Sequence, residues 1–164
     1  MRVFLLIILT FLAYELSAQN FTRDAGVRIG DFFSASYRQF IDDEQAVEGI
    51  LSAGRKGAKI TFLKEHSRPV LGHVSENLYF TYGYGGHAGF RYIDRYRVLN
   101  RTYGLDDYRF MPLIGVDGLV AIEYRFPELP VIVTMDIKPY FEYSTIEIFN
   151  VYLNSIGISI KYRF

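Results

Sequence analysis

The chain has 164 residues, which is enough for one domain and too few for two. Lys and Arg together number 18, as do Asp and Glu, so no net charge indicates a nucleic-acid partner. The absence of cysteine excludes a disulfide scaffold, a thiolate metal site, a cysteine nucleophile and a lipid anchored at cysteine.

Residues 1–18 have the pattern of a cleaved signal peptide. A basic start at Met1-Arg2 precedes an apolar run over 3–12 and a more polar stretch that ends in the small residue Ala18. The run is shorter than the roughly 20 residues of a membrane-spanning helix. Leu16 occupies a position where a small residue is usual, which leaves the exact cleavage site open, and a buried element of the mature domain is the alternative. We predict a signal peptide over 1–18 and one domain over 19–164.

The rest of the chain alternates with period two, which is typical of half-buried strands. Residues 25–40 alternate in two short runs around Gly30-Asp31, so they form either one strand or a hairpin. Strands are predicted around 47–53 and 59–62, with a turn at 55–57, and again over 78–91. Read as one strand, 25–40 gives seven strands in the whole chain, and read as a hairpin it gives eight.

The second half of the domain shows the longest alternation. Ile114 to Phe126 alternates over 13 residues, and a Pro-flanked turn at 127–130 leads to a second alternating run over 131–142. The chain ends with a strand over 156–164 that places isoleucines and aromatic residues on one face.

Three features favour lipid contact for the apolar face over a soluble barrel with an apolar core. The runs are longer than the usual strand of about 5–6 residues and match the roughly 9–11 of membrane strands. The opposite face combines charges with Gly and Ser, as a crowded lumen needs. Tyr and Phe, 14 of each, recur near strand ends, as interfacial girdles require.

The last eight residues, 157–164, resemble the C-terminal signal of outer-membrane β-barrels. They contain Gly157, the bulky Ile160 and Tyr162, and a terminal aromatic, Phe164. The resemblance extends to 19–164 as a whole, which looks like a small outer-membrane barrel of Gram-negative bacteria. It implies an all-β, antiparallel up-and-down transmembrane barrel of about eight strands, located in the outer membrane. Since bacterial barrels have even strand counts, we take 25–40 as a hairpin.

The same resemblance implies partners. These are outer-membrane lipid, lipopolysaccharide and, during biogenesis, the barrel-assembly machinery that reads the closing strand. We expect a monomer, with no nucleic acid, metal or cofactor.

A barrel of eight strands is just wide enough to be filled by side chains, so its charges must be paired. We therefore predict a filled lumen and no open diffusion pore, with Glu123, Arg125, Asp136 and Lys138 pairing across the 127–130 hairpin. The whole predicted lumen network comprises Arg28, Arg38, Glu48, Lys59, Arg91, Asp117, Glu123, Arg125, Asp136, Lys138, Glu142, Lys161 and Arg163.

The stretch from Arg91 to Arg109 is rich in arginine and tyrosine, which can bind phosphates and sugars. We predict that 93–109 is a long extracellular loop, because outer loops exceed periplasmic turns in length and the C-terminus lies in the periplasm. Alternatively, its arginines pair with its own aspartates or with lipid headgroups. The candidate binding residues are Arg95, Arg97, Arg101, Arg109, Tyr96 and Tyr103.

Enzymatic chemistry has weak support. His66 and Ser67 near Glu65 do not have the His-x-Ser-Asn spacing of the lipid A deacylases that the chain would have to resemble. Three histidines, His66, His73 and His87, lack the regular spacing of a metal site, and His87 is interpreted as a hydrogen-bonded lumen residue. We expect a non-enzymatic barrel that acts in membrane structure or in surface binding through its loops. A lipid A-modifying enzyme and a secreted soluble ligand-binding barrel are the alternatives.

Overall fold

The computed structural model describes residues 22–164 except 55, 72–74, 99–100, 146–148 and 154, and leaves out the side chains of 71, 75–76, 94–98 and 101–108. The predicted signal peptide and its cleavage site lie outside the described residues. The described chain is all β, and no helix among these residues is long and apolar enough to cross a membrane. The strands are β1 (Arg23–Ile29), β2 (Phe33–Phe40), β3 (Gln45–Gly54), β4 (Gly57–Leu71), β5 (Ser75–Val98), β6 (Arg101–Arg125), β7 (Val131–Ile137), β8 (Tyr140–Ser144), β9 (Asn150–Tyr152) and β10 (Ile156–Arg163).

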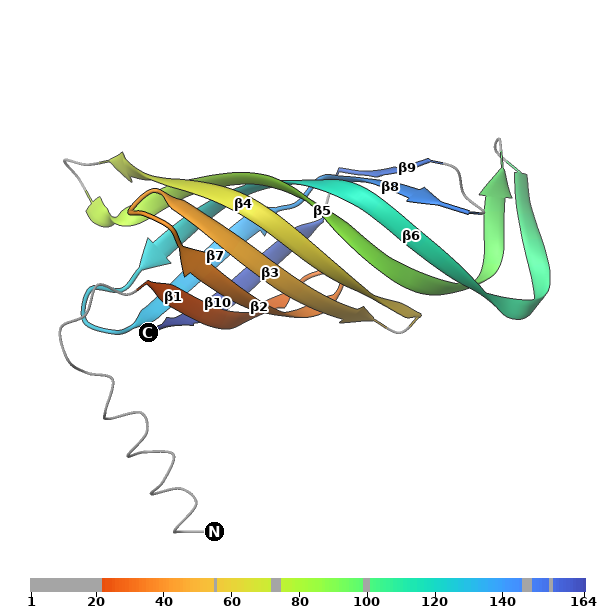
Figure 1. Cartoon of the computed structure of the whole chain (residues 1–164), viewed down its shortest axis with the longest axis horizontal. Coiled ribbons are helices and arrows are strands. Elements are labelled where there is room, and N and C mark those ends of the chain that lie inside the picture. Colours follow the sequence, from red (N-terminus) through yellow and green to blue (C-terminus); the bar gives the residue numbers. More distant parts are fainter. Residues whose placement is uncertain (1–21, 55, 72–74, 99–100, 146–148, 154) are drawn as a thin grey trace, which may run out of the picture.

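The strands form one closed antiparallel barrel (Figure 1). Each pairs with its neighbour in sequence from β1 to β6, and the barrel closes where β10 pairs with both β7 and β1. β7 and β8 both pair with β6, and β9 and β10 pair with β8 and β7. β7 and β8 are therefore two halves of one barrel strand, and β9 and β10 are two halves of the next. The barrel thus has the predicted eight strands.

The break between β7 and β8 lies at Pro139, because proline has no N–H to donate to the neighbouring strand. The pairs Val120↔Ile137 and Asp117↔Tyr140 keep one register across it, and the amide of Gly118 donates to the Pro139 carbonyl at 2.8 Å. The predicted strand over 131–142 is thus split at 138–139, but the same positions face inward on both sides of the break. On the other side of this strand, Ile137 pairs with Ile156 and Tyr140 pairs with Tyr152.

The predicted hairpin at 25–40 is confirmed. β1 ends at Ile29 and β2 begins at Phe33, so the turn includes Gly30-Asp31. This turn lies at one end of the barrel with the β3–β4 turn and the tip of β5–β6, and we call that end the hairpin end. The C-terminus and the β2–β3 and β6–β7 turns lie at the opposite end, the terminal end.

The prediction of a long loop over 93–109 was wrong. β5 has 24 residues and β6 has 25, and the two strands stay paired up to Val98↔Arg101. Beyond Arg91, the last β5 residue to pair with β4, this two-stranded ribbon projects past the rest of the barrel (Figure 1). The register shifts between residues 93 and 95. Tyrosines strongly favour strands, so an Arg–Tyr mixture is as compatible with a paired ribbon as with a loop.

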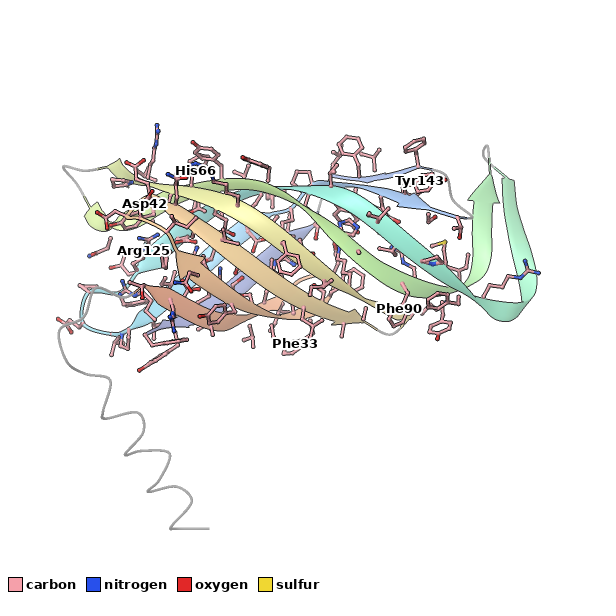
Figure 2. The ribbon with its side chains drawn as sticks, viewed as in Figure 1. Phe33, Asp42, His66, Phe90, Arg125 and Tyr143 are labelled. Carbon is pink, nitrogen blue, oxygen red and sulfur yellow. The ribbon has the colours of Figure 1, made fainter. Side chains whose placement is uncertain are left out.

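The two faces of the barrel differ in polarity. Large apolar side chains point outward on every side, for example Ile29 (68% exposed) on β1, Phe62 (58%) on β4 and Ile158 (56%) on β10. Phe33, Phe90 and Tyr143 lie among the outward side chains in Figure 2. Buried positions on the inside are mostly charged, Ser or Thr. This arrangement is the reverse of a soluble protein, which buries its apolar face.

Candidate functional site: the charged barrel interior

Arg38 on β2 is the centre of the interior network near the terminal end. It is fully buried and faces carboxylates from three other strands. Its Nε donates to Asp24 of β1 at 2.8 Å, its Nη1 donates to Glu65 of β4 at 3.1 Å, and Nη1 also donates to Glu123 of β6. The planar guanidinium, with five donors, suits this arrangement, which a lysine could not reproduce.

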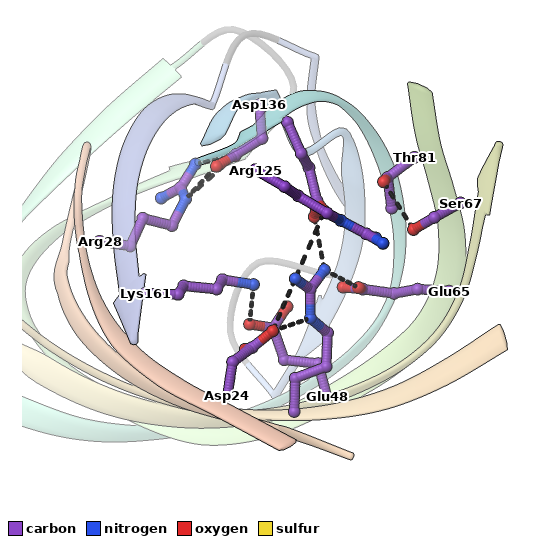
Figure 3. Close-up of polar contacts among 11 residues, drawn as sticks. Asp24, Arg28, Glu48, Glu65, Ser67, Thr81, Arg125, Asp136 and Lys161 are labelled. Carbon is purple, nitrogen blue, oxygen red and sulfur yellow. Dashed lines mark hydrogen bonds and ion pairs between the residues drawn. The ribbon is translucent and has the colours of Figure 1, made fainter. Parts of the chain in front are cut away.

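Two more cations extend this cluster (Figure 3). Lys161 on β10 donates to Glu48 on β3 at 2.5 Å, across the lumen from its own strand. Arg125 donates to Glu123 at 3.3 Å and stacks on Tyr79, whose ring centre lies 3.8 Å from its Cζ. Carboxylates and cations from opposite walls therefore meet in the middle of the barrel, as its small diameter allows.

Arg28 on β1 and Asp136 on β7 form a second pair. Nη2 and Nε of Arg28 donate to Asp136 at 2.6 and 3.0 Å, and Nη2 also reaches the Ser155 carbonyl at 3.2 Å. The guanidinium lies directly against Gly157, where a Cβ would overlap its atoms. Glycine at 157 therefore provides the space that this buried arginine occupies.

The third group lies toward the hairpin end and contains His87. Its Nδ1 lies 2.6 Å from Oδ2 of Asp117, and its Nε2 lies 3.7 Å from Oε2 of Glu142. Glu142 also accepts from Arg91 at 3.0 Å. The imidazole packs against Gly115 and meets the Tyr140 ring edge-on. The His87 side chain is fully shielded from solvent, whereas Arg91 and Glu142 line a cavity at the hairpin end.

The lumen is filled at its middle. The cavity between these groups, lined among others by Arg28, Glu48, Lys138 and Lys161, has about 20 Å³. That volume is enough for about one water molecule and for no diffusing solute.

Every residue of the predicted lumen network has its side chain on the inner face. Arg91, Arg125 and Arg163 are only partly buried, and the other ten are at most 8% exposed. The predicted pairing across the 127–130 hairpin was wrong. Glu123 lies opposite Thr134, and Asp136 lies opposite Ala121. Glu123 pairs instead with Arg38 of β2 and with Arg125 of its own strand, and Asp136 pairs with Arg28 of β1.

Sequence reasoning missed two members, Asp24 and Glu65, both fully buried. Asp24 lies one residue before the predicted start of the first strand. Glu65 lies beyond the strand predicted around 59–62, although β4 continues through it to Leu71. Continuing the alternation of Lys59 and Thr61 by two steps would have placed Glu65 inside.

The tempting Glu65-His66-Ser67 cluster is divided between the two faces. Glu65 and Ser67 point inward, where Ser67 bonds Thr81 at 2.8 Å, and His66 stacks on Tyr82 with ring centres 5.4 Å apart. His73 and the side chains of the candidate binding residues Arg95, Arg97, Arg101, Tyr96 and Tyr103 lie outside the described residues. Arg109 is exposed.

The C-terminal residues close the barrel. Phe164 and Arg23 exchange backbone hydrogen bonds of 2.9 and 3.2 Å. The centre of the Phe164 ring lies 6.4 Å from the ring centres of both Tyr162 and Tyr37. Ile160 points outward, and Gly157 faces Arg28 inside.

Comparison with known proteins identifies the fold alone. No family model and no curated protein matches the chain. Among solved structures, the N-terminal β-barrel domain of OprF from Pseudomonas aeruginosa is similar, with a TM-score of 0.57 and 10% sequence identity over 87% of this chain and 95% of that one. The closed eight-stranded antiparallel architecture is therefore that of a small outer-membrane β-barrel.

Proposed function

We propose that the mature chain is a non-enzymatic integral protein of a Gram-negative outer membrane, which supports the membrane and binds at the cell surface through its long hairpin. The observation that carries the proposal is the distribution of polarity, with an apolar exterior and a charged, filled interior. Exposed apolar area of this extent aggregates in water and is stable in lipid. A soluble ligand-binding barrel would have the opposite arrangement.

The interior argues for a structural barrel that conducts no solutes. Ion pairs link β1, β2, β3, β4, β6, β7 and β10 through the lumen, and the central cavity has only about 20 Å³. Interactions between opposite walls resist both collapse and unzipping of a barrel. The described histidines provide no support for the lipid A-modifying alternative, because His87 is shielded and His66 is separated from its neighbours by the strand alternation.

Surface binding is assigned to the β5–β6 ribbon. We infer that the hairpin end is extracellular, because the terminal end carries the C-terminus, which in such barrels is periplasmic. The ribbon beyond Arg91 then extends into the lipopolysaccharide layer with the arginines and tyrosines of 95–109, residue types that bind phosphates and sugars.

Membrane integration is tested by carbonate extraction and by gel mobility. The protein should remain in the carbonate pellet and migrate faster when unboiled. Recovery in the soluble periplasm would refute integration.

Topology and closure need separate tests. An epitope tag inserted near Tyr103 should be stained on intact cells, and staining only after permeabilisation would invert the topology. Purified protein in planar bilayers should give no steady conductance, and a reproducible single-channel step would contradict the filled lumen.

A further inference from the structure

A second cavity opens at the hairpin end, separate from the small one in the middle of the barrel. Its volume is about 250 Å³, against about 20 Å³ for the central cavity. The β1–β2 turn, the adjoining ends of β3 and β4, and residues of β5, β6 and β8 line it. Its lining includes the cations Lys56, Lys59 and Arg91, the carboxylates Asp31 and Glu142, and the apolar Phe32.

Lys59 is the unusual member of this lining. It is only 8% exposed, yet it forms no ion pair with a carboxylate in the described part of the chain. Its ammonium instead lies between two aromatic rings, 4.0 Å from the centre of Tyr140 and 5.0 Å from that of Phe32. Ring faces stabilise a cation without accepting its hydrogen bonds in the way that a carboxylate does. The three N–H donors of Lys59 are therefore available to an acceptor in the cavity.

The carboxylates of the cavity do not neutralise it. Glu142 is already engaged, accepting from Arg91 at 3.0 Å with His87 Nε2 3.7 Å away. Asp31 is exposed at the rim, on the β1–β2 turn. Lys59 therefore keeps a buried positive charge with no carboxylate bonded to its ammonium among the described residues, and such a charge favours an anion in the cavity.

We infer that this mouth cavity binds the oxyanion of a phosphate ester. The phosphate oxygens accept from the Lys59 ammonium and from those N–H groups of Arg91 that its bonds to Glu142 and Tyr152 leave over, and the rest of the ligand lies against Phe32. Charge-assisted hydrogen bonds of this kind are the strong ones in phosphate recognition. The phosphate ester comes either from lipopolysaccharide or from a soluble metabolite. The inference rests on the proposed function only for the side of the membrane on which the cavity opens.

The test uses the folded mature protein in maltoside micelles, which contain no phosphate, with calorimetric titration. The probes are inorganic phosphate and, separately, bisphosphorylated lipid A incorporated in the micelles, with its fully dephosphorylated form as comparator. Saturable binding of inorganic phosphate supports a soluble source. Binding of bisphosphorylated lipid A alone supports lipopolysaccharide. No saturable binding of either probe by the wild-type protein overturns the inference.

Variants locate the binding in the cavity. Lys59→Gln should weaken binding about tenfold or more, which corresponds to ~1.4 kcal/mol, because one charge-assisted bond is lost. Lys64→Gln is the matched control, since it removes an exposed lysine from the outer face of the same strand. Equal weakening by the two variants would assign the binding to nonspecific charge and overturn the inference.

Gel mobility without boiling shows whether Lys59→Gln folds. If it does not fold, a variant at the rim of the cavity, at Asp31, still tests the inference. Asp31→Asn removes an exposed negative charge on a turn and should tighten binding a few-fold, most clearly at low salt. If Asp31→Asn leaves the affinity unchanged at low ionic strength, the ligand does not sit in this cavity. The result is independent of membrane topology, which the epitope tag tests.

Discussion

Replacing Arg38 should be the most destabilising single change in the barrel. Arg38→Met removes the cation that faces Asp24, Glu65 and Glu123, all at most 1% exposed. Removing one partner of a buried ion pair costs about 3–5 kcal/mol, because it leaves an unpaired charge in a medium that solvates it poorly. Three carboxylates share this cation, so we expect a loss in the upper part of that range.

The measurement is equilibrium unfolding in lipid vesicles with urea, followed by the fraction of protein that migrates fast without boiling. The midpoint and slope give the free energy of unfolding. The matched control is Arg68→Met. Arg68 pairs with Glu44 at 3.7 Å on the surface, with side chains 66% and 59% exposed, and such pairs contribute about 0–1 kcal/mol.

A second variant separates loss of charge pairing from loss of packing. Arg38→Met with Glu123→Gln removes the cation and one of its anions together, so it should recover part of the stability lost in Arg38→Met alone. Arg38→Lys should keep the charge but lose the fork geometry, and its stability should lie between those of wild type and Arg38→Met. A loss below about 1 kcal/mol for Arg38→Met, equal to that of Arg68→Met, would refute the assignment of Arg38 as the centre of a buried network.

Three further changes test other parts of the barrel. Gly157→Val should expel the Arg28 guanidinium from its place and destabilise by about 1–3 kcal/mol as overpacking does, measured by the same unfolding assay, whereas an unchanged midpoint would contradict that contact. Deleting Phe164 removes the residue that closes the barrel against Arg23 and should lower the folded fraction in cells while secretion continues, so a normal folded yield would count against its role. Ile122→Arg places a charge on the outward face and should cost about 2–4 kcal/mol if that position is near the bilayer midplane, and no loss in vesicles would show that the face does not meet lipid.

Much of the fold could be predicted because a barrel strand has a strict period of two. Alternation over Ile114–Phe126 determined which side chains face inward, and the structure keeps that assignment at each of these positions. The requirement for an even number of strands then decided the uncertain hairpin at 25–40. Lys138-Pro139 interrupts a strand, yet the faces stay in phase because the β6 register is the same on both sides.

The length of β5 and β6 was harder to predict. Alternation there weakens beyond Arg91, where β5 is paired with β6 alone. A two-stranded ribbon with no further strand beside it encloses no lumen, so it is not required to alternate between an apolar and a polar face. The amino-acid composition of such a ribbon therefore does not distinguish it from an irregular loop.

The ion pairs inside could not be predicted even with a correct list of inward charges. Glu48 lies directly opposite Arg38 on the neighbouring strand, but its hydrogen bond goes to Lys161 on β10. Arg38 in turn reaches Glu123 on β6, on the far side of the lumen. Neighbour register follows from hairpins, whereas contacts across the lumen depend on how far the strands are staggered when the barrel closes. The ion pairs thus depend on the closed lumen as a whole. The sequence of one strand predicts only which of its charged side chains face inward and therefore need a partner.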